Sequence, residues 1–273
     1  MRPRFDRRYI EREFQRIADG LTTPLTVYLI GGGAMALRDL KGATKDIDLV
    51  VVDGDAYGQL WDVLMRLGYS EVKPLEAEYQ ALGATSCVEN ADGCRIDIFN
   101  QQVANKLVVT EEMRERSESF LSTNPLEVRL VSNEDIFLFK LVAGRDDDID
   151  DMNMLVQSGL DYGDVEEELE EQIDVLGDDR FATFVNEALL ELEERYGVTT
   201  PLDQRVDELT IRYYRGLEVL QALDEPMTVE ELAAELELSV TEVDERVEYL
   251  RKFDRLRQDG ERVSRTESGS SPS

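Results

Sequence analysis

Two aspartates one residue apart, Asp46 and Asp48, are the side chains with the clearest capacity for chemistry in this chain. They lie in the segment KDIDLVVV, whose apolar end is typical of a buried β-strand. Side chains two positions apart on a strand point to the same face, about 7 Å apart at a rise of roughly 3.3 Å per residue. Carboxylates this close repel each other unless a positive charge lies between them, and Mg²⁺ prefers one or two carboxylates together with phosphate oxygens. The pair therefore predicts a divalent-metal site.

Three glycines, Gly31 to Gly33, precede the aspartates and predict the second part of the site. They follow an apolar strand expected at 27–30 and precede a helix-forming segment, AMALRDL. A helix N-terminus attracts phosphate through its free backbone N–H groups, and glycine lets a ligand approach the backbone closely. The run therefore predicts a phosphate contact. Two alternatives stay open, because three glycines can also form a tight turn and an Asp-x-Asp can also end a strand.

The composition limits the chemistry that is available. The chain has no histidine, which excludes Ser-His-Asp and Cys-His catalysis, histidine bases and His-ligated zinc. Two cysteines, Cys87 and Cys94, exclude a disulfide framework. Catalysis by this chain would depend on carboxylates, lysine, arginine, hydroxyls and hard metal ions.

The charge balance predicts a protein adapted to high salt. The sequence holds 60 Asp and Glu against 30 Lys and Arg, a net charge of −30, and only six of its cations are lysine. Self-repulsion of this size is screened in molar salt, and the 42% hydrophobic content argues against a disordered chain. No apolar run has the length of a membrane span, and the polar, basic start MRPRFDRRYIEREF is unlike a signal peptide. We therefore expect a folded, halophilic, cytoplasmic protein.

Helical and strand patterns alternate along the first 160 residues, which favours an α/β (α+β) fold. Asp97 falls on a later strand, in a hairpin around Asp92–Gly93. The expected elements are a helix at 5–21, strands at 27–30 and from 46, a helix up to residue 40, a helix at 55–67, a hairpin at 81–100, a strand at 126–132, a helix from 133 to about 155, and two acidic helices within 163–196 that separate near Gly177.

The last part of the chain has a different organisation. A helix at 210–223, a helix-turn-helix within 227–256 and a hairpin around Asp259–Gly260 resemble a winged helix-turn-helix domain. The expected domains are a nucleotide-handling domain at 1–128, a helical domain at 129–204, a winged-helix domain at 205–265 and a disordered tail at 266–273.

The N-terminal motifs resemble the nucleotidyltransferase superfamily, which has the DNA polymerase β-like fold. This resemblance implies a mixed sheet with helices in the first domain. The family pattern is Gly-Gly or Gly-Ser, about ten residues of helix, Asp-x-Asp on a strand, and a third Asp on a later strand. The segment FKLVAGRDDDIDDM also resembles the Lys…Arg-x-x-Asp helix of minimal nucleotidyltransferases linked to toxin–antitoxin and abortive-infection systems. The matching positions are Gly31, Gly32, Asp46, Asp48, Asp97, Lys140, Arg145, Asp148 and Asp151.

This resemblance implies a Mg²⁺-dependent enzyme that transfers an NMP from an NTP to an RNA (including tRNA) or a protein, as a toxin-type effector. Asp46, Asp48 and Asp97 would be catalytic and hold two Mg²⁺ ions, and Gly31 and Gly32 would contact the phosphates. Lys140 and Arg145 would also bind the nucleotide. For these two, pairing with neighbouring acids is the alternative, since Arg145 and Asp148 are three apart. Asp97 could also be a solvated strand residue.

Two other functions stay open. In one, the chain is a winged-helix DNA-binding regulator whose nucleotidyltransferase fold only senses a nucleotide or partner. In the other, it is a non-catalytic scaffold or antitoxin. Residues 246–265 hold seven Arg or Lys that could contact DNA, while dimerisation to a homodimer is the alternative role for that domain. The N-terminal helix, with six arginines before Ile17, is a second candidate surface for nucleic acid.

Overall fold

The structure, a computed structural model, describes residues 2–73, 84–103 and 106–266. It divides into two compact units: Met1–Gln172 with Glu187–Thr200, and Ile173–Asn186 with Pro201–Ser273. The disordered tail expected at the C-terminus lies outside the described residues from 267 onward, as does the start of the hairpin expected from residue 81. The predicted division into three domains and a tail stays a prediction.

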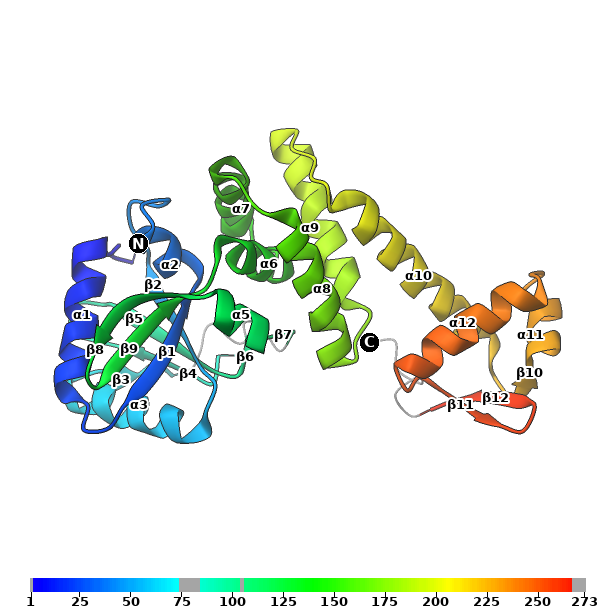
Figure 1. Cartoon of the computed structure of the whole chain (residues 1–273), viewed down its shortest axis with the longest axis horizontal. Helices are drawn as coiled ribbons and strands as arrows, with labels where there is room; N and C mark the ends of the chain where they lie inside the picture. Colours follow the sequence, from blue (N-terminus) through cyan, green and yellow to red (C-terminus); the bar gives the residue numbers. More distant parts are fainter. Residues whose placement is uncertain (1, 74–83, 104–105, 267–273) are drawn as a thin grey trace. The chain divides into compact units, whose positions relative to one another are not determined.

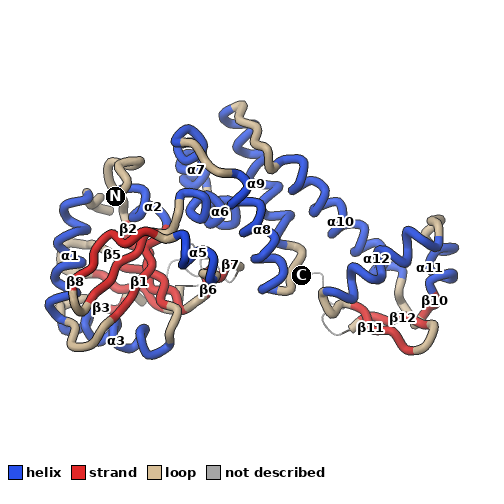
Figure 2. The backbone as a smooth tube through the Cα atoms, viewed as in Figure 1, coloured by secondary structure: helices blue, strands red, loops and turns tan. Residues whose placement is uncertain are grey.

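A seven-stranded sheet forms the centre of the first unit, in the order β3-β4-β5-β2-β1-β9-β8. Strand β1 is antiparallel to β2 and parallel to β9, and β2 is parallel to β5. The sheet is therefore mixed, which confirms the predicted α/β class (Figures 1 and 2). The strands are β1 (Leu25–Ile30), β2 (Asp46–Val51), β3 (Ser70–Glu71), β4 (Ser86–Glu89), β5 (Arg95–Asn100), β8 (Glu118–Thr123) and β9 (Leu126–Leu130), and β6 (Gln102–Val103) pairs separately with β7 (Leu107–Val108).

Successive side chains of β2 and β5 point to opposite faces of the sheet, so the apolar core residues and the acids lie on different faces. Ile47 lies opposite Ile96 in the parallel register, and both are fully buried. The next pair along, Asp48 and Asp97, points to the other face because successive side chains on a strand alternate. Asp46 lies on that face too, two residues before Asp48. The apolar face thus fixes the register that brings the two strands' acids side by side.

Helices α1 (Arg7–Gly20) and α3 (Gly54–Arg66) pack against each other and against the sheet (Figure 1). The helix predicted at 5–21 is confirmed, and α1 buries Ile10, Phe14 and Ile17, which recur at helical spacing. The remaining helices of this unit, or shared between the two units, are α2 (Gly31–Leu37), α5 (Glu111–Arg116), α6 (Asn133–Ala143), α7 (Asp146–Ser158), α8 (Tyr162–Leu176) and α9 (Phe181–Tyr196).

The continuous helix predicted from 133 to about 155 is wrong, because it consists of α6 and α7. The sequence allows Ser132 or Asn133 as the cap of this helix, and the side chain of Ser132 is the one that caps α6. Gly144 then adopts a left-handed conformation with φ 57° and donates its N–H to Lys140 O, which ends the helix. The chain restarts at α7, which packs against α6 and places its acids beside Lys140.

Several elements were not anticipated from the sequence. Strand β8 at the edge of the sheet shows no buried side chain, so it lacks the alternation that reveals a strand. Strands β3, β6 and β7 have two residues each, too few for any periodicity. Helix α2 ends at Leu37, earlier than predicted, and the loop 38–45 follows it.

The second unit contains α10 (Asp203–Ala222), α11 (Val229–Glu235) and α12 (Val240–Lys252) with a small sheet in the order β10-β12-β11. Its core includes Val219, Leu232, Val247 and Leu250. The helix, helix-turn-helix and hairpin expected from the sequence are present in that order, and their assignment as a winged-helix domain stays a prediction. The strands are β10 (Met227–Thr228), β11 (Leu256–Asp259) and β12 (Arg262–Arg265).

Within residues 2–73, 84–103 and 106–266, no helix has both the length and the apolar surface that crossing a membrane requires.

Candidate active site

One cavity of about 360 Å³ brings together most of the residues that the sequence singles out. Its volume lies in the range of small-molecule sites. The walls come from the starts of β2 and α2, the middle of β5, the loop 38–45, and the junction of α6 and α7. The predicted site residues that line it are Gly32, Asp46, Asp48, Asp97, Lys140 and Arg145.

Asp97 is a buried carboxylate without a strong hydrogen-bond donor. It is 1% exposed, and among the described residues no amide, hydroxyl, guanidinium or ammonium group donates to either of its oxygens. Its neighbour on strand β4 is Cys87, whose thiol is a weak hydrogen-bond donor. Burial raises the pKa of Asp97 to about 8, and the nearby charge of Asp48 adds to the rise.

The pKa of Asp48 is raised in the same way. Asp48 lies directly opposite Asp97 on neighbouring strands, which are about 4.8 Å apart in a sheet. Burial raises the pKa of Asp48 to about 6, and the charge of Asp46 contributes as well. The negative charge of each carboxylate thus disfavours ionisation of the other, as expected of groups that share a cation.

Asp46 is paired with an arginine from the start of the chain. Arg2 donates Nη1 to Asp46 Oδ1 at 2.6 Å and Nη2 to Oδ2 at 3.2 Å, a bidentate contact. Both side chains are partly exposed at the cavity. The third carboxylate of the predicted cluster is therefore held by a cation that the protein itself supplies.

Glycine is required at two positions because site side chains crowd the turn after β1. Gly31 has φ 62°, and a Cβ there would lie 2.6 Å from Asp48 Oδ2. A Cβ on Gly32 would lie 2.8 Å from Thr44 Oγ1. Contacts this short are not tolerated, so the glycines let Asp48 and Thr44 approach the backbone. The predicted phosphate contact at these glycines stays a prediction.

Lys140 and Arg145 are bound by acids, which is the alternative that the sequence left open. Lys140 is 6% exposed, and its Nζ lies 2.6 Å from Asp148 Oδ1 and 2.9 Å from Asp151 Oδ2. Arg145 Nε lies 2.7 Å from Asp148 Oδ2. Burial lowers the pKa of Lys140, but the two aspartates raise it by more, so the ammonium stays charged. A nucleotide role for both cations stays a prediction, and it would require exchange of these partners.

Sequence reasoning missed several cavity residues in segments without a motif, including Arg2, Arg4 and Thr44. It also missed Lys41, which binds Asp151 at 2.6 Å, and Lys45, which binds Asp147 at 3.0 Å. The scarcity of lysine was the available signal, since three of the six lysines line this cavity. Two of those three lie between the glycines and the Asp pair.

The donor set suits a hard cation, with carboxylate oxygens at the sheet and no sulfur or nitrogen ligand needed. Within the described residues, no three His, Cys, Asp or Glu side chains are close enough to hold a metal ion by themselves. Arg2 binds Asp46, one of the three predicted ligands. A metal that arrives with phosphate oxygens needs only one or two carboxylates. The unsatisfied oxygens of Asp97 beside Asp48 meet that requirement.

A mixed sheet with strand-borne carboxylates beside a glycine turn indicates a nucleotidyltransferase. Residues 10–196 match the family described as "Nucleotidyltransferase of unknown function (DUF6036)", and the chain belongs to this family. A solved structure from H. pylori, described as a candidate nucleotidyltransferase, is similar with a TM-score of 0.35 and 13% identity over 76% of this chain and 93% of that chain. The comparison with curated proteins gives no match.

Proposed function

We propose that this chain is a Mg²⁺-dependent nucleotidyltransferase that moves an NMP from an NTP to a hydroxyl group of an RNA or protein acceptor. The observation that carries this proposal is the carboxylate of Asp97, which is buried, has neither oxygen satisfied by a strong donor, and faces the cavity beside Asp48. A buried charge without a partner is costly, and such groups concentrate at functional sites. A divalent cation would satisfy both carboxylates at once.

The residues divide the work as follows. Asp48 and Asp97 would hold the metal, joined by Asp46 once Arg2 leaves it, and the metal would stabilise charge on the attacking and leaving oxygens. The acceptor oxygen attacks the α-phosphorus, and the bond to the bridging oxygen breaks so that pyrophosphate leaves. Asp97 would take the proton of the acceptor hydroxyl as the general base. Gly31 and Gly32 give the triphosphate access to backbone N–H groups.

Two lysines that line the cavity, Lys41 and Lys45, suit the triphosphate. Lys41 and Lys45 are partly exposed and lie in the loop next to the glycines. Each is bound to an acid of α7, so a triphosphate would compete with Asp151 and Asp147 for the two ammonium groups. No step requires histidine, in agreement with the composition.

The direct test is transfer of label from an α-labelled NTP with Mg²⁺ and high KCl. Wild type should label an RNA or protein acceptor, and Asp46→Ala with Asp48→Ala should not. Asp207→Ala with Asp244→Ala is the matched control, because both residues are exposed acids of the second unit. Equal transfer by wild type and the Asp46 and Asp48 double variant would refute the proposal.

The proposal extends to a toxin-type effector, in line with the likeness of the Lys140 to Asp151 segment to minimal nucleotidyltransferases. Such an effector arrests growth by modifying an essential acceptor. Induced expression should then arrest a salt-adapted host with the wild-type chain and spare it with the Asp46 and Asp48 double variant. Equal growth with both chains would remove the toxin role and leave the enzymatic proposal standing.

A further inference from the structure

Three arginines, Arg4, Arg8 and Arg12, form a row that leads away from the cavity, and we call it the arginine row. Arg4 lines the cavity itself. Arg8 and Arg12 are exposed on α1, four residues and therefore about 6 Å apart on one face of the helix. The row thus connects the cavity with the outer surface of the first unit.

The row is fixed in place at both ends. Phe5, next to Arg4, is buried and exchanges two backbone hydrogen bonds with Thr44 of the cavity wall, at 2.7 and 3.0 Å. The ring of Phe5 contacts Tyr9 with centroids 4.4 Å apart, and the guanidinium of Arg12 lies over Tyr9 at 5.5 Å. The backbone beside Arg4 and the guanidinium of Arg12 are therefore held in place before any ligand binds, which reduces the entropy lost on binding.

No carboxylate pairs with these arginines among the described residues. The acids at the border of the row are engaged elsewhere. Glu11 binds Arg7 at 2.9 Å, Asp6 accepts the N–H of Tyr9, and Asp92 accepts the hydroxyl of Tyr9. In a chain with twice as many acids as bases, three adjacent arginines without an acid are unexpected unless an external anion binds them.

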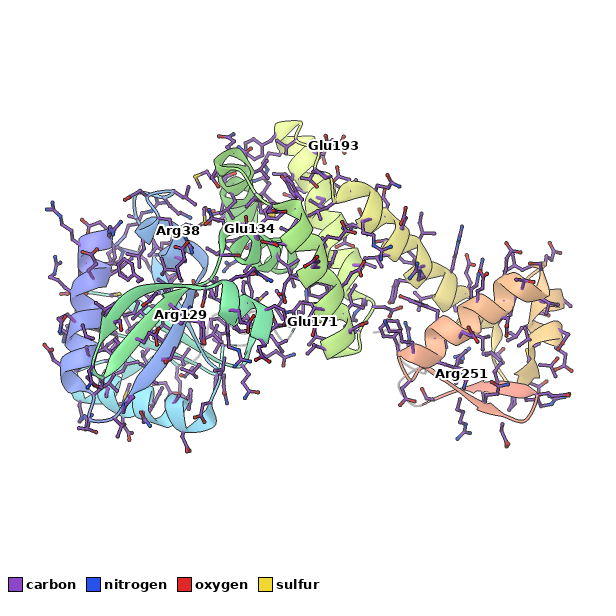
Figure 3. All side chains as sticks on the ribbon, in the orientation of Figure 1. Arg38, Arg129, Glu134, Glu171, Glu193 and Arg251 are labelled. Carbon is purple, nitrogen blue, oxygen red and sulfur yellow. The ribbon has the colours of Figure 1, made fainter. Side chains whose placement is uncertain are left out.

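The C-terminal cations behave differently. Five of the seven between 246 and 265 are paired with carboxylates of their own unit, which neutralises the surface proposed for DNA. The other two bind neutral groups, since Arg251 donates to Gln258 and Arg257 to Ser264. Arg251 is labelled in Figure 3, on α12. The ion pairs are Arg246–Glu218, Lys252–Asp174, Arg255–Asp179, Arg262–Glu231 and Arg265–Asp224.

We propose that the arginine row binds the sugar-phosphate backbone of a single-stranded polynucleotide whose terminal hydroxyl enters the cavity. This inference rests on the proposed function and narrows its acceptor to a nucleic acid. Arginine is the side chain best suited to phosphate, because its planar fork donates two parallel hydrogen bonds. Arg8 and Arg12 lie one helical turn apart with Arg4 ahead of them at the cavity, and such a narrow set of guanidinium groups fits one backbone rather than the two of a duplex.

The test is fluorescence anisotropy of the full chain with a short end-labelled single-stranded RNA, and with DNA of the same sequence. It is carried out without NTP or Mg²⁺, so binding is measured independently of catalysis. Arg8→Glu with Arg12→Glu should weaken binding by about 10-fold or more. The slope of log K against log salt should fall by about 1.4, since each lost phosphate contact contributes about 0.7 on a single strand.

Two matched variants make the result specific. Arg8→Lys with Arg12→Lys keeps the charge and should retain most of the binding, and circular dichroism should show every variant folded. Arg251→Glu with Arg257→Glu changes two arginines of the second unit that also lack a carboxylate, and it should leave binding unchanged.

Three results would overturn the inference: no binding of either oligonucleotide, unchanged binding by the Arg8 and Arg12 glutamate variant, or an equal loss in the Arg251 and Arg257 control. Label transferred only to protein would also overturn it while the proposed transferase activity stands. Conversely, binding that depends on the row without any NMP transfer would refute the proposed function and keep the row as a nucleic-acid surface. A preference between RNA and DNA identifies which polynucleotide binds.

Discussion

Two pairs of carboxylates line the same cavity and differ in their surroundings. On the sheet, Asp48 and Asp97 have no ion pair in the part of the chain that the structure describes. On α7, Asp148 and Asp151 each contact two cations. Their partners are Lys140 and Arg145 for Asp148, and Lys41 and Lys140 for Asp151.

This difference indicates that the α7 acids have a structural role, whereas the sheet pair, Asp48 and Asp97, has a ligand-binding role. The protein supplies four ion-pair contacts where α6, α7 and the loop 38–45 must be held together. Among the described residues it supplies none to Asp48 or Asp97, although burial raises the pKa of both carboxylates. A sequence with so few lysines places three of them around the α7 acids and none beside Asp97. The sheet pair therefore behaves as a site kept for an external cation.

The largest expected effect is on activity. Asp48→Asn should lower NMP transfer by on the order of 10³-fold, because it removes a ligand of the transition-state charge while keeping the side chain's shape. The melting temperature should not fall. A stability loss that parallels the activity loss would show that Asp48 is structural and would erase the difference between the two pairs.

The second effect is on stability and concerns the α7 pair. Asp148→Ala should lower the free energy of unfolding by about 3–5 kcal/mol, because it leaves the buried Lys140 and the guanidinium of Arg145 without their main partner. Urea denaturation at neutral pH measures this loss. A loss below about 1 kcal/mol, the range of exposed ion pairs, would contradict the structural role.

The contribution of Asp148 to stability depends on pH with a definite sign. Burial raises the pKa of Asp148, but Lys140 and Arg145 lower it by more, so the folded pKa lies below its usual value of 3.8. Its contribution to stability is therefore present above pH 3.8 and disappears as the pH falls through the folded value. Wild type and Asp148→Ala should approach each other in stability only in strong acid.

The sheet pair should respond in the opposite direction. Asp97→Asn should raise the free energy of unfolding of the metal-free protein at pH 8 by on the order of a few kcal/mol, because a buried unpaired charge costs more than the neutral amide that replaces it. The folded pKa of about 8 lies above the usual value of 3.8, so the carboxyl destabilises the fold increasingly as the pH rises between these values. The gain of the variant should be absent below about pH 4 and level off above about pH 8. A variant less stable than wild type at pH 8 in the presence of a chelator would contradict the unpaired state.

The smallest effect comes from the turn that holds Asp48. Gly31→Ala should lower the free energy of unfolding by about 1–2 kcal/mol, since φ 62° disfavours a side chain and the new Cβ would crowd Asp48. Gly42→Ala in the nearby loop is the control, because a Cβ there meets no atom within 4 Å. Equal stability of the two variants in thermal unfolding would show that the turn can relax around Asp48.

Local patterns in the sequence predicted the elements that carry the site. The strands around Asp48 and Asp97, the cap at Ser132 and the hairpin turn at Gly93 follow from alternation, capping and turn chemistry within a few residues. The end of α6 at Gly144 was missed because apolar residues resume at helical spacing after the charged segment 145–148, at Ile149, Met152 and Leu155.

The partners of the charged residues could not be predicted, because they are distant in sequence. Arg2 and Asp46 are 44 residues apart, and Lys41 and Asp151 are 110 apart. No periodicity links such positions, and with 60 acids each cation has many candidate partners. The resemblance that pointed to Lys140 and Arg145 as nucleotide ligands did not reveal that α7 binds both in the free protein.

The most direct test of the difference between the Asp48–Asp97 pair and the Asp148–Asp151 pair is a titration with Mn²⁺, a paramagnetic substitute for Mg²⁺. Electron paramagnetic resonance measures the bound Mn²⁺ in the presence of a non-hydrolysable NTP analogue. Wild type and the Asp207→Ala, Asp244→Ala control should bind Mn²⁺ saturably, and Asp48→Asn with Asp97→Asn should show no specific binding. Undiminished Mn²⁺ binding by the Asp48 and Asp97 variant would contradict the account, because the cation would then be held elsewhere.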